Sequence, residues 1–381
     1  MEKIFTALGL MSGTSMDGVD ASIIKSDGLG QFNNVSNKYW EFDLELRKRL
    51  VDLRNEIKTK DNLIEFSNEL KILERELTIF HGEIVNEISS NSNENIDLIG
   101  FHGQTIFHDP KNKISKQLGD GRLLSQLTKK EVVYDFRNND IQNGGQGAPL
   151  TPIFHNLLAN NIFNDFKDIF SNILNIGGIS NITKTVMNKD ISKKKIEAFD
   201  IGPGNCLIDE WIRKNSNKKF DDGGSIGKSG TNNQLLFNQA IDNFNFISYE
   251  NSLDIKDFDI SFARGLSLED GCATITNFTA YLIVEGIKSL HKKEDYFSNK
   301  YLICGGGRKN NFLIETINNY LNKYENLTLE NIDNFNHNGD FIESQAFGYL
   351  AIRSYLKLPI TFPETTRCSK PLTGGSLIKN F

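Results

Sequence analysis

The fold assignment depends first on the segment Gly9-Leu10-Met11-Ser12-Gly13-Thr14-Ser15-Met16-Asp17-Gly18-Val19-Asp20. It joins two runs rich in strand-forming residues, 4–10 and 19–24, and a third such run follows at 39–44. A connection of this length, with several glycines and hydroxyl side chains, exceeds what a tight hairpin needs. Converging backbone amides and hydroxyls can bind phosphate, and the two aspartates suit a hydrated Mg²⁺. A wide Asx-type turn is the alternative interpretation.

The element order that follows this segment occurs twice along the chain. In the first half, after the three strands, apolar periodicity predicts helices at 46–56 and 62–89, a strand at 96–101, a helix at 123–129 and a strand at 131–136. In the second half it predicts strands at 171–176, 181–186 and 195–201, a helix from Cys206, a helix at 269–290, a strand at 300–304, a helix at 310–323, a strand at 327–332 and a helix at 343–356. The repetition predicts two related α/β domains that face a cleft. We expect one domain at 1–136, completed by 357–381, and the other at 137–356.

The composition is that of a soluble globular protein and excludes several functions. The chain has 381 residues, 24% of them charged, and a net charge of −6, which argues against nucleic acid as the main partner. No secretory leader and no apolar run long enough for a membrane span is visible. The four cysteines lie far apart and suggest reduced core thiols. We therefore expect a cytoplasmic protein that binds neither nucleic acid nor membrane.

A second segment with chemical potential is 199–209, Phe-Asp-Ile-Gly-Pro-Gly-Asn-Cys-Leu-Ile-Asp. A predicted strand ends near Asp200, and a Gly-Pro-Gly turn then opens a helix. A carboxylate beside a turn that a phosphate can approach closely is what phosphoryl transfer needs, and Asp200 could accept a proton from the nucleophile. A turn-capping aspartate is the alternative.

A third segment, 302–311, contains three successive glycines after an apolar strand. Ligands of open α/β sheets bind at the carboxyl ends of strands, so this turn is a candidate binding surface, although a flexible turn would have the same sequence.

Two other nucleotide-binding motifs do not match this sequence. The segment 223–229 resembles a P-loop, but Asp222 stands where its first glycine belongs and no strand precedes it. The glycine runs also lack the dinucleotide-binding pattern.

His102 and Arg137 each follow a predicted strand. No carboxylate or cysteine stands at metal-ligand spacing from His102, so a hydrogen bond to a substrate is the better interpretation. Arg137 could bind a carboxylate through two parallel hydrogen bonds, with a surface ion pair as the alternative.

Together these segments resemble the anhydro-N-acetylmuramic acid kinase family, in family order and over almost the whole chain. The matching segments are 9–20, 100–105, 117–120, 135–137, 144–149, 175–181, 200–205, 304–307 with Asn310, and Glu343 with 346–347. The resemblance implies an α/β fold of two RNase H-like domains, with the duplicated βββαβαβα order of the sugar kinase/actin/hexokinase superfamily, around a hinged cleft. It also implies a homodimer.

The resemblance further implies that ATP and Mg²⁺ are the cofactors. The implied nucleotide-binding residues are Gly13, Thr14, Ser15, Met16, Asp17, Gly18, Val19 and Asp20 at the phosphates, Gly202, Pro203, Gly204 and Asn205 in a second phosphate loop, and Gly305, Gly306, Gly307 and Asn310 near the adenosine. Asp20 is the implied metal residue.

By the same resemblance, Asp200 is the catalytic base. The implied amino-sugar contacts are Thr14, His102, Asp120, Arg137 and Glu343, with Arg137 on the lactyl carboxylate. The implied reaction opens 1,6-anhydro-N-acetylmuramic acid with water and phosphorylates O6, giving N-acetylmuramic acid 6-phosphate in peptidoglycan recycling.

Two alternatives remain: a kinase of the same fold that acts on another amino sugar, and a non-catalytic nucleotide switch of the actin type. The sequence also departs from the family in one loop, 249–254, where Asn251 stands in place of a lysine. That departure puts a basic contact from this loop in doubt.

Overall fold

The computed structural model describes residues 3–163, 169–185, 196–244, 253, 255–290, 298–324 and 327–381. The chain divides into two compact units, one formed by Met1–Leu157 with Phe341–Phe381 and the other by Leu158–Asp340. These bounds differ from the expected 1–136 with 357–381 and 137–356. Except for Leu253, the loop that contains Asn251 lies outside the described residues. In the described part of the chain, no helix is long and apolar enough to cross a membrane.

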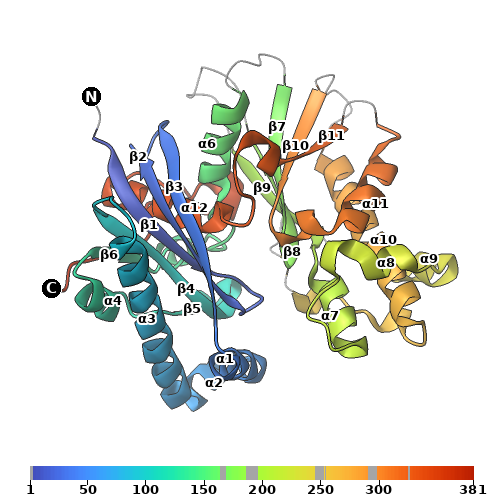
Figure 1. The fold of residues 1–381 in the computed structure, drawn as a ribbon, viewed down its shortest axis with the longest axis horizontal. Helices are drawn as coiled ribbons and strands as arrows, with labels where there is room; N and C mark the ends of the chain where they lie inside the picture. The colour runs from blue at the N-terminus through green and yellow to red at the C-terminus, as the bar shows by residue number, and fades with distance from the viewer. Residues whose placement is uncertain are drawn as a thin grey trace. The chain divides into compact units, whose positions relative to one another are not determined.

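The first unit is built on a seven-stranded sheet (Figure 1). Its strand order is β12 (Ser376–Ile378), β6 (Glu131–Tyr134), β4 (Leu98–Asp109), β1 (Phe5–Ser12), β2 (Gly18–Ser26) and β3 (Phe32–Glu41), and β5 (Ile114–Leu118) pairs with β4. Strands β1, β2 and β3 form an antiparallel meander, while β4 runs parallel to both β1 and β6.

The second unit contains a five-stranded sheet with the same plan. Its order is β11 (Leu327–Asn331), β10 (Ser298–Cys304), β7 (Ile169–Ile176), β8 (Ile179–Lys184) and β9 (Glu197–Pro203). Here β7, β8 and β9 form the antiparallel meander, and β10 runs parallel to β7 and β11. The order β6-β4-β1-β2-β3 of the first sheet is thus repeated, which confirms the predicted duplication and the α/β fold class.

Helices pack on each sheet through apolar faces. The first unit contains α1 (Leu44–Glu56), α2 (Lys60–Glu65), α3 (Ser67–Ser90), α4 (Gly121–Thr128), α5 (Asn138–Gln142), α12 (Ile342–Tyr355) and α13 (Pro363–Thr366). Helix α6 (Pro152–Phe163) contains the boundary between the two units, which falls after Leu157. The second unit contains α7 (Cys206–Asn215), α8 (Ser225–Ser229), α9 (Gln234–Asn243), α10 (Leu268–Leu290) and α11 (Asn311–Leu321). Helix α10 is buried on most of its surface because it packs against α7, α8, α11 and β9.

Several sequence-based boundaries differ from those of the structure. The helix predicted at 62–89 is two helices separated by Phe66, whose φ and ψ of −91° and 22° are not helical. The strand predicted at 39–44 is β3, which ends at Glu41, because Asp43 already caps α1 through a 2.8 Å hydrogen bond from Leu46 N. Strand β9 does not end near Asp200 but continues to Pro203.

Helix α12 belongs to the first unit and not, as expected, to the second, because it packs directly on β1, β2 and β4. Two glycines permit this approach. A Cβ on Gly9 would lie 1.9 Å from Ser344 O, and a Cβ on Gly100 would lie 2.1 Å from Phe347 O. The backbone of the helix therefore takes the space that side chains would fill on an ordinary strand.

We expect Gly9→Ala to destabilise the protein by about 1–3 kcal/mol or more, because the clash is with helix backbone and cannot be relieved by a rotamer change. Urea unfolding followed by far-UV circular dichroism measures this. Gly30→Ala is the matched control, since a Cβ there meets nothing within 4 Å, and its effect should stay within about 0.5 kcal/mol. Equal midpoints for the two variants would contradict the close approach of α12.

Candidate active site

The turn between β1 and β2 has backbone amides that are available to a ligand. Met16 closes the turn by donating from its backbone N to Gly13 O at 3.2 Å, and its φ of 52° lies in the left-handed region. Among the described residues, the backbone amides of Thr14 and Ser15 donate to no protein acceptor, and both residues are exposed. A strained turn with free amides fits the predicted phosphate cradle.

The same turn is held by hydrogen bonds from Gln104 on β4. Its Nε2 donates to Gly13 O at 3.1 Å, and its Oε1 lies 2.7 Å from Ser12 Oγ, which is also 2.9 Å from Gly18 O. Arg54 Nη1 adds a hydrogen bond of 3.1 Å to Thr14 O. The shape of the turn is therefore set by side chains from two other elements.

The end of this turn carries negative charge. Burial, and then the charges of Asp17, Glu41 and Asp20, raise the pKa of Tyr39 well above its ordinary value. Asp17 Oδ1 also accepts a hydrogen bond of 2.7 Å from Ser15 Oγ, and Asp20 lies within β2. Carboxylate oxygens are the ligands that Mg²⁺ prefers, so the donor set fits that ion. The described residues contain no cluster of three metal-ligating side chains, so any ion would need further oxygens from a ligand.

Arg137 and His102 are in contact within the first unit. Arg137 Nη2 lies 2.8 Å from His102 Nε2, and Arg137 Nη1 donates to Gly147 O at 2.6 Å. His102 Nδ1 lies 2.7 Å from Gly103 O. A carbonyl can only accept, so Nδ1 carries the proton and Nε2 accepts from Arg137. Burial, and then the charge of Arg137, hold the pKa of His102 well below its ordinary value, so the ring is neutral.

Glu343, in the first turn of α12, acts on the same arginine. Burial lowers the pKa of Arg137 to about 10, while the charges of Glu343 and Asp140 oppose that shift. The Nε atom of Arg137 is buried and, within the part of the chain that the structure describes, has no hydrogen-bond partner. Such a donor is costly to leave unpaired and fits an anionic ligand. The structure thus groups three of the five predicted sugar contacts.

Asp120, another predicted sugar contact, is engaged in local structure. Its Oδ1 caps α4 by accepting hydrogen bonds from Arg122 N at 2.9 Å and Leu123 N at 3.1 Å. Its backbone N donates to Thr78 Oγ1 at 3.0 Å. Asp120 is therefore the N-cap of α4.

Asp200 lies in the second unit, within β9. The β8–β9 register passes from Asn181↔Asp200 to Ser180↔Gly202, which leaves Ile201 as a bulge directly after the aspartate. Asp200 Oδ2 accepts a hydrogen bond of 2.9 Å from Leu253 N. Burial raises the pKa of Asp200 to about 6, although this hydrogen bond opposes the shift. The side chain is therefore a base near neutral pH.

The predicted second phosphate loop uses its amides internally. Gly204 N donates to Gly178 O and Asn205 N to Gly177 O, both at 2.8 Å. A Cβ on Gly204 would lie 2.0 Å from Gly177 O, so glycine is required for the close approach of these two turns. Asn205 then forms the N-cap of α7, as the sequence predicted for a helix starting at Cys206. These contacts fix the loop but leave the two amides unavailable to phosphate.

The glycine turn after β10 packs on the end of β7. Gly305 has a φ of 80°, and a Cβ there would lie 2.4 Å from Asn175 Oδ1. Gly307 has equally little room beside Ile176. Asn310 caps α11 through a hydrogen bond of 2.9 Å from Leu313 N to its Oδ1. The turn is therefore ordered, which argues against the alternative of a flexible connection.

Comparison with known proteins identifies the family. The family model described as anhydro-N-acetylmuramic acid kinase matches residues 5–380. The chain belongs to the anhydro-N-acetylmuramic acid kinase family. An anhydro-N-acetylmuramic acid kinase of Pelagibacter ubique is 50% identical and covers 100% of both chains. One of Rhizobium etli is 37% identical and covers 99% of both.

Solved structures align with this family member more loosely. The activator of 2-hydroxyisocaproyl-CoA dehydratase from Clostridium difficile with bound ADPNP has a TM-score of 0.42 and 11% identity, covering 91% of this chain and 94% of that one. The fold class therefore rests on the strand order that the two sheets of this chain share.

The sequence analysis assigned no role to the turn Gly177–Gly178. This turn joins β7 and β8, and β7–β8 occupies in the second sheet the place that β1–β2 occupies in the first. A Cβ on Gly177 would meet nothing closer than 3.6 Å, so the turn is open to approach. The repeated element order was the signal that could have identified this second candidate for phosphate.

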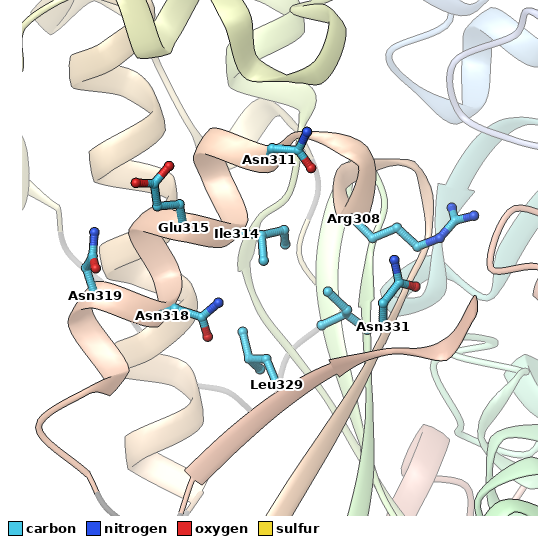
Figure 2. A pocket seen from close by; sticks show the side chains of 9 residues that line it. Arg308, Asn311, Ile314, Glu315, Asn318, Asn319, Leu329 and Asn331 are labelled. Carbon is cyan, nitrogen blue, oxygen red and sulfur yellow. The ribbon is translucent and has the colours of Figure 1, made fainter. Parts of the chain in front are cut away.

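A cavity of about 440 Å³ lies in the second unit between α11 and β11. Figure 2 shows Asn311, Glu315 and Asn318 along the helix and Leu329 on the strand. None of the predicted nucleotide or sugar residues lines it. Arg308, which was not among the predicted site residues, is part of the lining. The cavity adjoins the predicted nucleotide turn, because Arg308 follows Gly307 and Asn311 follows Asn310 along the chain.

We expect His102 to remain neutral, with its proton on Nδ1, from pH 8 down to pH 5. ¹⁵N NMR of the imidazole rings tests this, because the two nitrogens of a fixed neutral tautomer have well-separated shifts. His102→Gln identifies the signal, and exposed imidazole in solution provides the reference titration near its ordinary pKa of about 6.5. Titration of the His102 signal near that value would contradict the hydrogen-bonded pair with Arg137.

Proposed function

We propose that this chain is an ATP-dependent kinase that converts 1,6-anhydro-N-acetylmuramic acid and water to N-acetylmuramic acid 6-phosphate. Membership of the family over residues 5–380 supports the substrate class. The observation that carries the chemistry is Asp200, a carboxylate whose pKa is raised to about 6 and whose position is fixed by a bulge and by Leu253 N. The product class places the enzyme in cell-wall recycling.

Asp200 would accept a proton from the water that attacks the anomeric carbon. The bond between C1 and O6 breaks, O6 attacks the γ-phosphorus of ATP, and ADP leaves. A base with a pKa near 6 is ionised at neutral pH yet retains enough basicity to assist the attack. The alternative capping role is less well supported, because Asp200 accepts its hydrogen bond from the distant Leu253 and not from the following turn.

Arg137 would bind the lactyl carboxylate of the sugar. Its Nη atoms are held by two neutral acceptors, His102 Nε2 and Gly147 O, and its Nε–H is buried and unpartnered among the described residues. Both ring nitrogens of His102 are engaged, so we infer that His102 orients Arg137. Glu343 would contribute from α12, and Thr14 and Asp120 remain candidate contacts.

The ATP phosphates would lie at Gly13–Asp20, where the free amides of Thr14 and Ser15 are found. Mg²⁺, if held at Asp20 with Asp17 nearby, would neutralise phosphate charge. Gly202–Asn205 would act as a second phosphate loop through the turn Gly177–Gly178, which they hold in place. Gly305–Gly307 with Asn310 would lie near the adenosine. A cytoplasmic location and a homodimer complete the proposal.

Turnover with 1,6-anhydro-N-acetylmuramic acid and ATP in ¹⁸O-water tests the reaction. We expect a 6-phosphorylated product that carries ¹⁸O at C1, as measured by mass spectrometry. Phosphorylation of a plain amino sugar instead would support a sugar kinase but contradict the assignment of 1,6-anhydro-N-acetylmuramic acid as its substrate. Tight ATP binding without turnover of any sugar would favour a nucleotide switch.

For Asp200→Asn we expect turnover to fall by about 10²–10⁴-fold, the usual contribution of a positioned base. In the unchanged enzyme, kcat/KM should fall about tenfold for each pH unit below about 6, because the carboxylate becomes protonated as pH falls through its raised pKa. The residual activity of the variant should lack this acid limb. ATP affinity is the control and should change little. An acid limb that persists in Asp200→Asn would assign the base to another group.

A further inference from the structure

Arg308 follows the glycine turn directly and is almost fully buried. Its side chain is 2% exposed, yet it carries a guanidinium group. Figure 2 shows that this side chain extends away from Ile314 and Glu315 on α11. An unpaired charge at such a depth is strongly unfavourable, so this group needs acceptors that compensate for its burial.

Each nitrogen of the guanidinium group has at least one acceptor. Nε and Nη2 donate to the two oxygens of Asp333 at 3.0 and 3.2 Å, and Nη1 donates to Asp340 Oδ1 at 2.5 Å. Asn338 Oδ1 lies 3.4 Å from Nη2. Burial lowers the pKa of Arg308, but the hydrogen bonds with Asp340 and Asp333 outweigh it, and the net shift is upward. A planar fork with this many donors is specific to arginine.

The remaining contact of Arg308 is with the glycine turn. Nη1 donates to Gly305 O at 3.1 Å, while Gly305 N donates to Gly339 O at the same distance. Gly339 N in turn donates to Asp333 Oδ1 at 2.8 Å. A Cβ on Gly339 would lie 2.5 Å from Arg308 Nε, so this backbone lies directly against the guanidinium group. Both peptide groups of Gly305 are thus fixed by one network.

We propose that Arg308 is a positioning residue that sets nucleotide affinity by fixing the Gly305–Gly307 turn without touching the nucleotide. This inference rests on the proposed function of that turn. A left-handed glycine with its carbonyl and amide both held can present only one backbone shape to a ligand. Misplacement of such a surface by about 1 Å is enough to cost on the order of 10²-fold in function.

Lys309 provides a matched control in the chain itself. It pairs with the same Asp340, through the other carboxylate oxygen, but its side chain is 62% exposed. Exposed ion pairs contribute little to stability. Removal of the lysine changes charge at Asp340 without disturbing the contacts of Arg308 to Gly305 and Asp333.

The test is ADP binding to the full chain by isothermal titration calorimetry, without sugar, for Arg308→Lys, Asp340→Asn and Lys309→Met. We expect Arg308→Lys to weaken ADP binding by about ten- to a hundredfold, because lysine keeps the charge but loses the fork. Asp340→Asn should act in the same direction and less strongly, which keeps the test available if Arg308→Lys does not fold. Lys309→Met should stay within about twofold of the unchanged protein.

Steady-state kinetics separate positioning from a general loss of structure. Positioning predicts that KM for ATP rises with the ADP dissociation constant, while KM for the sugar at saturating ATP is unchanged. Folded Arg308→Lys and Asp340→Asn variants with unchanged ADP affinity would overturn the inference and leave the kinase intact. Equal losses for ADP and sugar would assign Arg308 a merely structural role. Absence of ADP binding by the unchanged protein would overturn the proposed nucleotide turn itself.

Discussion

The first unit depends on how closely helix α12 lies on its sheet. Gly9 on β1 and Gly100 on β4 leave room for the helix backbone where other residues would place a side chain. This approach buries the helix and brings Phe347 to 4.5 Å, between ring centroids, from His102. It also brings the charge of Glu343 within range of Arg137. The packing of one helix thus determines the polar cluster at the candidate sugar site.

The two sheets share a strand order, but the hydrogen bonds that hold their first hairpin turns differ. In the first, the hairpin turn after β1 leaves two amides free and is held through its carbonyls by Gln104 and Arg54. In the second, the carbonyls of Gly177 and Gly178 accept hydrogen bonds from Gly204 and Asn205, which ties the hairpin turn to the start of α7. Duplication therefore supplies two turns at equivalent places, and the local hydrogen bonds decide which groups each turn can offer to a ligand.

The sequence predicted the repeated element order because long, strongly periodic segments such as α3 and α10 and apolar strands such as β1 and β7 have clear signals. It missed β5 and β12, which are short and lie outside the repeated pattern. It also placed the segment that forms α12 in the wrong unit, because amphipathic spacing shows that a helix packs but not on which sheet. Gly9 and Gly100 explain why α12 packs on the first sheet, but only once their contacts with Ser344 and Phe347 of that helix are known.

Among the site residues, sequence pattern identified types of chemistry better than roles. Asp120 occupies a cap position that propensity also explains, and the structure shows the cap. His102 was expected to contact the sugar, yet both of its ring nitrogens already have protein partners. Burial raises the pKa of Asp200 and the hydrogen bond from Leu253 N partly opposes that shift, and neither is visible from the neighbours of Asp200 in sequence. Sequence motifs locate the residues of a site, but the role of each residue depends on contacts with residues that are distant in sequence.

Two buried guanidinium groups show how such contacts distinguish one task from another. Arg308 is hydrogen-bonded to carboxylates of Asp333 and Asp340, and its pKa is raised. Arg137 donates instead to an imidazole nitrogen and a carbonyl, and burial lowers its pKa to about 10. A guanidinium group already neutralised by carboxylates gains little from a further anion, whereas one held by neutral acceptors gains much in a site of low dielectric. The contacts of Arg308 are therefore those of a group that fixes backbone, whereas Arg137 retains the capacity to pair with an anion.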